Sequence, residues 1–469
     1  MNAFVGRHRE LAALDAAYQS TRMEFIPIYG RRRIGKSELI LHFIRDKTAI
    51  YFLGKKAPAG LQIREFLELA ADGLGEPLLA QASVSNWREA LQLVLAHRPK
   101  GHKLVLVLDA FQWTAQSSPE LPSLLQAICD QERRNNSQLM LILCGSYMGF
   151  MEKEVLGHES PLFGRRTAQL LLRPFSYQEA GQFHPQIATT ERAMIYFLCG
   201  GIPYYLRFFS SADSIPVNIR KQLLSEYAAL FREPDFLLRE ELKEIEKYCG
   251  ILFALASGAP NARQIAVKTG ISERSLNYYL QALIDLGYVA RKHPLTERAP
   301  SSRHVHFKIE DPLLRFWFRF IYPHQAFLSQ YGPERMFTEQ IAPHLDAYFG
   351  ECFERLCREA LPALYQQEGV AGSFTIGEYW DAKTQIDVVG LRTDNRIDIG
   401  ECKWGLVRSA PTVETELSER MRRYPNASNS TLQGRVFCRR VPSKSSTPHV
   451  HRWHSLENLY ALPPPESII

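Results

Sequence analysis

The segment Gly30–Ser37 reads GRRRIGKS and constrains the fold of this chain more than any other, because it matches the pattern G-x-x-x-x-G-K-[ST]. The β-rich run FIPIY precedes it and a helical pattern follows it, which is the context that the motif requires. In such a loop, backbone N–H groups close around phosphate oxygens, and the helix N-terminus adds partial positive charge. An ordinary glycine-rich turn is the alternative. We therefore predict a phosphate-binding site formed by Gly30, Arg31, Arg32, Arg33, Ile34, Gly35, Lys36 and Ser37.

Lys36 and Ser37 have separate roles in a site of this kind. The lysine reaches the β and γ phosphates, and the serine ligates Mg²⁺. The apolar run LVLVLD (104–109) ends in Asp109, whose carboxylate is expected to hold the same Mg²⁺ ion through a water. ATP and Mg²⁺ are therefore the expected cofactors, with Ser37 and Asp109 as the metal-holding residues of this site.

Ala110 follows Asp109, at the position where many hydrolytic ATPases of this type have a glutamate that orients the attacking water. A methyl group neither accepts a proton nor aligns a water molecule, so we expect slow ATP hydrolysis. Gln112 is a candidate to position the water instead, as glutamines do in some GTPases. An efficient ATPase whose catalytic carboxylate comes from elsewhere is a third, less favoured, alternative.

Two further segments supply candidate groups for the γ-phosphate. Ser146 ends the run LILCGS and is a candidate polar sensor, although a serine at the end of a strand is as often simple turn chemistry. Arg165 and Arg166 follow a glycine in SPLFGRRT and are candidates to neutralise phosphate charge, in the same subunit or across a subunit contact. A solvated basic pair is the more common role of adjacent arginines.

The pattern of apolar residues divides the chain into an α/β multidomain protein. In residues 1–175, β-rich runs alternate with helical patterns, which is typical of a mostly parallel sheet and predicts a P-loop ATPase core. Residues 176–245 read as a helical lid and residues 311–339 as a helical linker. The last region, residues 340–469, begins with a helical pattern and continues with strand-like segments, so it is a second α/β domain.

Residues 246–310 read helix, glycine-centred turn, helix and short strand, the order of a winged helix-turn-helix. Ser272 is a plausible N-cap for the second helix, whose leucines fall on one face. We expect the outward residues and the basic residues of the wing to contact DNA, although such folds often bind only proteins. The DNA-contact candidates are Arg274, Asn277, Gln281, Arg291 and Lys292, with Arg303 as a further basic residue near the wing.

Acidic residues and a lysine gather in the sequence of the last domain. Glu401 and Lys403 are two apart in the run IGECKWG, so they project from the same side of a strand. Asp387 lies in the neighbouring run TQIDVVGL, and Glu354 lies in the helix before it. Cleavage of a phosphodiester needs carboxylates that hold Mg²⁺ and a lysine that positions water. We predict Glu354, Asp387, Glu401 and Lys403 as catalytic residues, with Asp387 and Glu401 as metal ligands, whereas a solvated charged face is the alternative.

Composition excludes few classes of function. A net charge of +6 over 469 residues tolerates a polyanionic partner without requiring one. The eight cysteines form no CxxC pair, so we interpret them as reduced thiols in a cytoplasmic protein. Charged residues at the N-terminus do not fit a signal peptide, and no run reaches the roughly 18 apolar residues of a membrane span. We expect no membrane partner.

Several motifs together resemble a prokaryotic AAA-type ATPase family, similar to archaeal ATPases and related to signal-transduction ATPases. The segments that carry the resemblance, over nearly the whole chain, are FVGRHREL, YGRRRIGKS, LDAFQW, SPLFGRRT, GGIPYYL, the helix-turn-helix and DPLLRFWFRF. The resemblance implies an AAA-type parallel sheet with a helical lid, a winged helix, and a C-terminal PD-(D/E)XK nuclease-like domain with a restriction-endonuclease-like fold. It also implies that Gly6 and Arg7 lie near the nucleotide base and that Pro203 is a lid contact to it.

The chain departs from the family pattern at two positions. Members usually have Asp-Glu where this chain has Asp109-Ala110, which puts ATP turnover in doubt but not ATP binding. They often have Glu-Ile-Asp where this chain has Gln385-Ile386-Asp387, which removes an accessory carboxylate and keeps the essential aspartate.

The hypothesis that follows is an ATP-binding, DNA-associated protein in which a slow ATPase switch controls a Mg²⁺-dependent nuclease-like domain. By analogy alone, such a protein suits defence against foreign DNA or the biology of mobile elements. The alternative is a non-catalytic, ATP-dependent DNA-binding or regulatory protein with a retired nuclease fold. DNA is the expected partner, and homo-oligomerisation is left open.

Overall fold

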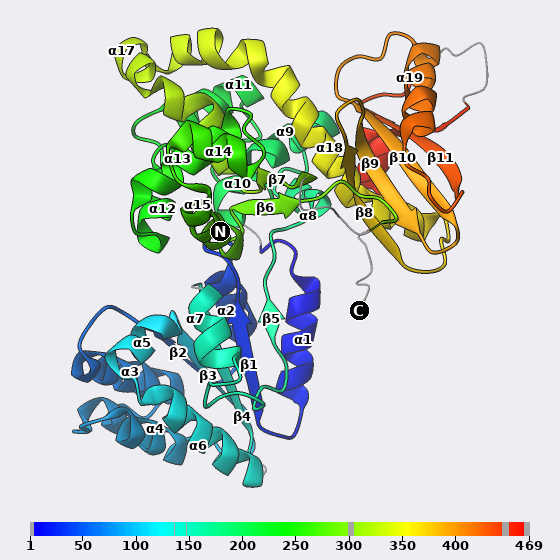
Figure 1. Cartoon of the computed structure of the whole chain (residues 1–469). Helices are drawn as coiled ribbons and strands as arrows, with labels where there is room; N and C mark the ends of the chain where they lie inside the picture. Colours follow the sequence, from blue (N-terminus) through cyan, green and yellow to red (C-terminus); the bar gives the residue numbers. More distant parts are fainter. Residues whose placement is uncertain (1–3, 136, 147, 299–303, 443–449, 464–469) are drawn as a thin grey trace. The chain divides into compact units, whose positions relative to one another are not determined.

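The computed structural model describes residues 4–135, 137–146, 148–298, 304–442 and 450–463 (Figure 1). Arg303 lies outside the described residues. The chain divides into two compact units, Met1–Pro174 and Phe175–Ile469, each with its own hydrophobic core. All eight cysteines are described and all are free thiols. Within the described part, none of the helices is long and apolar enough to cross a membrane.

The first unit is built on a parallel sheet with the strand order β2-β3-β4-β1-β5 (Figure 1). The predicted apolar runs form its strands, and every residue of β1, β3 and β4 is buried, as expected for strands covered on both faces. The strands are β1 Glu24–Tyr29, β2 Ala49–Leu53, β3 Leu104–Asp109, β4 Leu139–Gly145 and β5 Leu170–Leu171.

Helices cover both faces of this sheet. One face packs against α1 and α2, and the other packs against α3, α4 and α6. The α-helices of the unit are α1 His8–Gln19, α2 Lys36–Ile44, α3 Ala59–Leu74, α4 Trp87–Ala96, α5 Phe111–Ser117, α6 Leu121–Arg134 and α7 Met148–Phe150. Short turns of 3₁₀- and π-helix add η1 Pro77–Gln81 and η2 Met151–Leu156.

The parallel register brings the carboxyl ends of the central strands to one edge of the sheet. Leu53 pairs with Asp109 across β2 and β3, and Tyr29 pairs with Gly145 across β1 and β4. The loop that follows β1, the carboxylate that ends β3 and the residue that follows β4 therefore meet at this edge, which is where open parallel sheets bind ligands.

The first part of the second unit is helical. Its elements pack around one continuous core that extends into the later sheet. The elements are α8 Tyr177–Gly181, α9 Thr189–Cys199, α10 Pro203–Leu206, α11 Ile215–Asn218, η3 Ile219–Leu224, α12 Glu233–Glu241, α13 Ile245–Ala256, α14 Ala262–Thr269, α15 Glu273–Asp285, α16 Pro312–Phe316, η5 Trp317–Ile321, η6 Tyr322–His324, α17 Gln325–Arg335 and η7 Met336–Ile341.

The segment predicted as a winged helix contains the expected order of elements. Gly270 ends α14 in a left-handed conformation, and Ser272 caps α15 by accepting a hydrogen bond from the Ser275 N–H. The strands β6 Val289–Lys292 and β7 His306–Ile309 then pair as an antiparallel hairpin. The predicted cap is confirmed.

A second sheet with the order β12-β11-β10-β9-β8 completes the unit. Strands β8, β9 and β10 pair antiparallel, and β10, β11 and β12 pair parallel, because α19 connects β10 to β11. Sequence patterns predicted β9, β10 and β11 but missed β8 and β12. The elements are α18 Ala342–Gln367, β8 Phe374–Trp380, β9 Gln385–Arg392, β10 Arg396–Lys403, α19 Ala410–Arg423, β11 Thr431–Cys438, β12 Arg452–Ser455 and α20 Leu456–Ala461.

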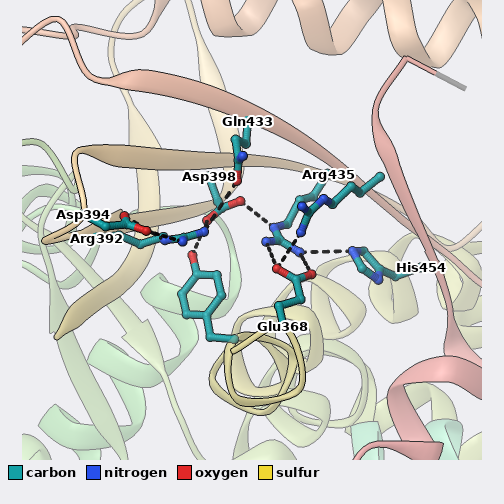
Figure 2. A network of polar contacts seen from close by, with 9 residues as sticks. Glu368, Arg392, Asp394, Asp398, Gln433, Arg435 and His454 are labelled. Atoms are coloured by element: carbon teal, nitrogen blue, oxygen red, sulfur yellow. Dashed lines mark hydrogen bonds and ion pairs between the residues drawn. The ribbon is translucent and has the colours of Figure 1, made fainter. Parts of the chain in front are cut away.

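A buried polar network fastens the end of α18 to this sheet, and Figure 2 shows Arg435 between Asp398 and Glu368. The Arg435 Nε lies 2.6 Å from Asp398 Oδ1, and its two terminal nitrogens each lie 2.7 Å from one oxygen of Glu368. The hydroxyl of Tyr365 donates to Asp398 Oδ2 at 2.7 Å. Because Arg435 is fully buried, its charge is tolerated only through these partners.

Candidate functional sites

The phosphate loop has the backbone that its glycines predict. Gly30 has a φ of 146°, and a Cβ at this position would lie 2.4 Å from the Leu172 carbonyl oxygen. Gly35, which precedes the first residue of α2, has a φ of 86°. Both positions are strained for any residue with a Cβ, so the two glycines of the motif are required by the shape of the loop.

Lys36 is buried inside this loop. Its Nζ donates to the carbonyl oxygens of Gly30 and Arg31, each at 2.9 Å. The ammonium therefore lies within the turn where the motif places phosphate. Ile34 is fully buried beneath the loop.

Arg7 holds the backbone of the phosphate loop. It is 5% exposed, and its guanidinium donates to the carbonyl oxygens of Ile34 at 3.1 Å and Arg173 at 2.8 Å. Gly6 and Arg7 both have positive φ angles at the start of α1. Contacts of these two residues with a nucleotide base stay a prediction, and so does that of Pro203, the first residue of α10 in the second unit.

Asp109 is the polar centre at the end of β3. Its Oδ2 accepts hydrogen bonds from the hydroxyls of Ser37 and Tyr51, both at 2.6 Å, and its Oδ1 accepts one from the Ala110 N–H at 2.7 Å. The sequence motif predicted Asp109 and Ser37. It did not predict Tyr51, because the run AIYFL carries no signal beyond that of a strand.

Ala110 and Gln112 lie beside this carboxylate. Ala110 adopts a left-handed conformation with a φ of 50° at the start of α5. Gln112 is 7% exposed, and its Oε1 has no hydrogen-bond partner among the described residues. A Cβ on Gly145 would lie 3.2 Å from this Oε1, so the amide faces the end of β4. Its role in positioning water stays a prediction.

The other phosphate candidates have different surroundings. Arg165 is bound within the unit, with 3.0 Å contacts to Asp130 and to the Pro161 carbonyl oxygen. Arg166 is exposed, and Ser146 follows β4 directly. The predicted roles of Ser146 as a polar sensor and of Arg165 and Arg166 in neutralising phosphate charge stay predictions.

The DNA-contact candidates divide into exposed and engaged residues. Arg274, Asn277 and Gln281 are exposed on the outer face of α15, and Arg291 is exposed on β6. The Lys292 Nζ, in contrast, lies 3.1 Å from Glu310 Oε1, so part of its charge is neutralised. Their contacts with DNA stay predictions.

The predicted acidic residues of the second unit meet where α18, β9 and β10 come together. The Asp387 Oδ2 accepts a hydrogen bond from the Cys402 N–H at 3.0 Å, which ties β9 to β10 beside Glu401. The Glu401 Oε1 lies 3.0 Å from Lys403 Nζ, as their strand spacing predicts, and its Oε2 contacts Arg420 of α19. Both acids are at least 93% buried, with exposed fractions of 7% and 2%.

Burial and the charge of Asp387 both affect the other two carboxyl groups of this site. Burial raises the pKa of Glu354 to about 8, and repulsion from Asp387 adds to this effect. Burial and repulsion from Asp387 also raise the pKa of Glu401. Acidic groups held together against their own repulsion are common at functional sites, because a cation bound there relieves the cost.

Three residues that the sequence did not single out surround this acidic site. Glu378 of β8 has its Oε2 at 2.5 Å from Lys308 Nζ and 3.8 Å from Arg358 NH1. The same Arg358 nitrogen lies 3.9 Å from Glu354 Oε2. Sequence reasoning missed Glu378 because it missed β8, and it missed Lys308 because that residue comes from the distant strand β7.

The arrangement of ligands for a metal is incomplete. In the described part of the chain, no group of three or more His, Cys, Asp and Glu side chains is arranged to hold a metal ion. Lys403 and Arg420 occupy the oxygens of Glu401. Carboxylate oxygens are the kind of ligand that a divalent cation prefers. For Glu401 to bind a metal, however, its contacts with Lys403 and Arg420 must break. Metal binding by Asp387 and Glu401 stays a prediction.

Two families match separate parts of the chain. Residues 4–209 match a family described as an ATPase domain predominantly from Archaea. Residues 317–414 match a family described as "Archaea bacterial proteins of unknown function". The first unit is therefore an archaeal-type ATPase domain with the parallel sheet of P-loop proteins, and the predicted class of its fold is confirmed.

One curated protein and two solved structures are similar to this chain. The uncharacterized protein MJECL04 of Methanocaldococcus jannaschii is 31% identical over 409 residues, which cover 86% of this chain and 87% of that protein. A Walker-type ATPase of Pyrococcus abyssi is 19% identical with a TM-score of 0.50, covering 67% of this chain and 96% of its own. The ORC2 protein of Aeropyrum pernix is 17% identical with a TM-score of 0.47, covering 70% and 97%.

Proposed function

The chain belongs to the same family as MJECL04 of Methanocaldococcus jannaschii, and we propose that its ATPase domain is an ATP-binding switch controlling DNA contact and cleavage in the second unit. The observation that supports ATP binding is the arrangement of side chains at one edge of the first sheet. There the buried Lys36 ammonium and the Ser37–Asp109 pair lie together. The proposal of cleavage rests on the acidic site formed by Glu354, Asp387 and Glu401.

The phosphate loop supplies what a triphosphate needs. Lys36 and the amides of the loop bind phosphate oxygens, and Arg31, Arg32 and Arg33 add positive charge nearby. Ser37 and Asp109 are the residues that would hold Mg²⁺, which neutralises phosphate charge when bound. Their hard oxygen atoms are the ligand type that Mg²⁺ prefers.

Slow hydrolysis follows from the residue after Asp109. Ala110 has no group that accepts a proton, and Gln112 is the nearest candidate that orients a water molecule. A protein that retains ATP for long periods acts as a switch, because its conformation persists until turnover or release.

A titration of the full chain with fluorescent ATP in the presence of Mg²⁺ tests nucleotide binding. We expect Lys36→Ala to weaken affinity by about 100-fold or more, since it removes a buried charge-assisted contact to phosphate. Lys55→Ala is the matched control, because Lys55 is an exposed lysine of the same unit that pairs with Glu65. Equal affinity for wild type and Lys36→Ala would remove the basis for the switch.

The acidic site is proposed to cleave phosphodiesters. When bound, a Mg²⁺ ion would supply charge stabilisation at the scissile phosphate and lower the pKa of a water. Asp387 and Glu401 are the residues proposed to hold it, Glu354 adds a carboxylate from α18, and Lys403 positions the water. The supporting observations are that Asp387 and Glu401 are 7% and 2% exposed, and that burial and the charge of Asp387 raise the pKa values of Glu354 and Glu401.

Nicking of supercoiled plasmid by the full chain tests cleavage. We expect Mg²⁺-dependent nicking by wild type, and loss of nicking with unchanged ATP binding in Lys403→Ala and Asp387→Asn. Lys383→Ala is the control, because Lys383 is exposed in the turn before β9. Unchanged nicking in Lys403→Ala would discard this site.

The second candidate function is a non-catalytic regulator in which the acidic site is closed. The engagement of Glu401 by Lys403 and Arg420 favours it, as does the incomplete set of metal ligands among the described residues. ATP-dependent DNA binding in a gel-shift assay, without cleavage by Mg²⁺ or Mn²⁺, is the result that this function predicts.

DNA contact is proposed for the outer face of α15 and for Arg291. These residues are exposed and contribute positive charge or amide groups, which suits contacts to phosphates and base edges. In a fluorescence-anisotropy titration at several salt concentrations, Arg291→Ala is expected to reduce the salt dependence of affinity by about one phosphate contact. Arg396→Ala, at an exposed arginine of β10, is the control.

A further inference from the structure

Tyr51 lies on the face of β2 that packs against the helix of the phosphate loop. Residues of this strand alternate between two cores, so that Ile50 and Phe52 face one and Ala49 and Tyr51 face the other. The second of these cores contains Leu39 and other residues of α2. Strand alternation therefore directs Tyr51 toward the element that begins with Lys36 and Ser37.

The hydroxyl of Tyr51 contacts the carboxylate of Asp109. It donates to Oδ2 at 2.6 Å, the same oxygen that accepts from the Ser37 hydroxyl at 2.6 Å. The Ala110 N–H donates to the other oxygen at 2.7 Å. Asp109 is 4% exposed. Donors from β2, α2 and the start of α5, together with the Cys144 thiol of β4, thus determine how this carboxylate is oriented.

Tyr51 contributes a hydrogen bond to this site and is not itself proposed as a ligand of the cation. Its hydroxyl lies 2.6 Å from Asp109 Oδ2 and donates to that oxygen. Its contribution is the direction of one O–H bond.

We propose that Tyr51 is a positioning residue of the nucleotide site, holding the Asp109 carboxylate in the orientation in which it receives Mg²⁺ with ATP. This inference rests on the proposed binding of Mg²⁺-ATP. Ser37 would have two tasks in that site, because its oxygen would bind Mg²⁺ while its proton is donated to Asp109. Tyr51 has a single task and comes from β2, which is separate from the phosphate loop. It therefore keeps the Asp109 carboxylate in place while the loop adjusts to phosphate.

A purely structural role for Tyr51 makes a different prediction. A hydroxyl that only satisfies the buried carboxylate stabilises the fold and leaves the metal requirement unchanged. A positioning role changes the Mg²⁺ concentration at which ATP binds tightly, whereas affinity without metal stays the same. The two roles are therefore separated by a metal titration of nucleotide affinity.

The experiment compares wild type, Tyr51→Phe and Tyr18→Phe as full chains. Tyr18 is a tyrosine of α1 whose ring packs on Phe43, so it is a matched control for the loss of one hydroxyl. Affinity for fluorescent ATP is measured in EDTA and at increasing Mg²⁺. For Tyr51→Phe we expect affinity in EDTA within about twofold of wild type and a Mg²⁺ midpoint about 3- to 10-fold higher, the effect of one hydrogen bond to a charged group.

The same comparison in the Asp109→Asn background shows whether Tyr51 acts through Asp109. There Tyr51→Phe should add no further shift of the Mg²⁺ midpoint. A midpoint equal to that of wild type in Tyr51→Phe overturns the inference, and so does an equal shift in both backgrounds. If wild type itself binds no ATP at any Mg²⁺ concentration, the proposed function fails instead, so the two failures are distinguishable.

Discussion

The Nζ of Lys308 lies 2.5 Å from Glu378 Oε2, and this ion pair joins β7 of the helix-turn-helix segment to the edge strand β8 of the second sheet. Two more contacts join the same β6–β7 segment to β8. His306 stacks on Trp380 with ring centroids 4.5 Å apart, and the Leu295 N–H donates to the Glu378 carbonyl oxygen at 2.7 Å. The β6–β7 hairpin and the loop within it are therefore bound to the edge of the second sheet.

Removing this ion pair should loosen both strands together. Glu378 is 6% exposed, so Lys308→Met leaves a buried carboxylate with a weaker partner and should lower the local opening free energy by about 2 kcal/mol. Hydrogen exchange of the β7 and β8 amides measures this quantity in the intact chain. In a double-mutant cycle with Glu378→Gln, we expect a coupling of about 1–3 kcal/mol. Additive effects would show that the two side chains do not stabilise the junction together.

Restoring a carboxylate after Asp109 should speed ATP turnover. Ala110 already has a left-handed backbone, and Ala110→Glu keeps the same Cβ, so the substitution adds a proton acceptor without a new backbone demand. We expect kcat for ATP hydrolysis to rise by about 10- to 100-fold, measured as phosphate release at saturating Mg²⁺-ATP. Ala110→Gln is the neutral control of similar size. Equal turnover in the two variants would contradict the missing-base explanation.

Arg435 should be essential to the stability of the second unit. Arg435→Met leaves the buried Asp398 and the carboxylate of Glu368 without their main partner, with an expected loss of about 3 kcal/mol in unfolding free energy. Arg396→Met, at the exposed first residue of β10, is expected to cost less than about 0.5 kcal/mol. Urea denaturation followed by tryptophan fluorescence compares them, and similar losses would refute the importance of the network.

His454 should make the second unit sensitive to mild acid. Burial lowers the pKa of its imidazole to about 4, and the positive charge of Arg435 contributes. The unfolded chain binds a proton near pH 6.5 and the folded chain does so only near pH 4, so stability is lost as pH falls through this window. The loss approaches about 3 kcal/mol, from 1.36 kcal/mol for each unit of pKa difference.

Neighbouring groups do not reverse this prediction. Against the cost of burial, hydrogen bonds and charge from Arg435 and Arg452 lower the pKa of Glu368 to about 2, so the contribution of Glu368 to the pH dependence of stability falls below about pH 4.5. Asp398, which pairs with Arg435, also acts on the His454 imidazole, and its charge opposes the lowering of the His454 pKa. Denaturation at pH 7 and pH 5 should show a smaller difference in His454→Gln than in wild type. An identical pH dependence would exclude the imidazole as the cause.

Much of the first unit could be predicted because its signals are local. The glycines, Lys36 and Ser37 of the phosphate loop lie within eight positions, and β1, β3 and β4 are continuous apolar runs. The pairing of Glu401 with Lys403 was predicted in the same way, from strand alternation over three residues. Strand β8 was missed because its pattern FTIGEYW mixes polar residues and a glycine with the apolar ones.

The sequence by itself determined which backbone segments form the phosphate loop, the buried strands and the caps, since those depend on conformations of neighbouring residues. Only the tertiary structure decided which charged and polar groups, distant in sequence, form hydrogen bonds and ion pairs with one another. It placed Tyr51 on Asp109, Lys308 on Glu378 and Arg435 on Glu368, pairs separated by 58, 70 and 67 residues. Such contacts depend on strand register and on the packing of whole elements, and no local pattern of residue types encodes either.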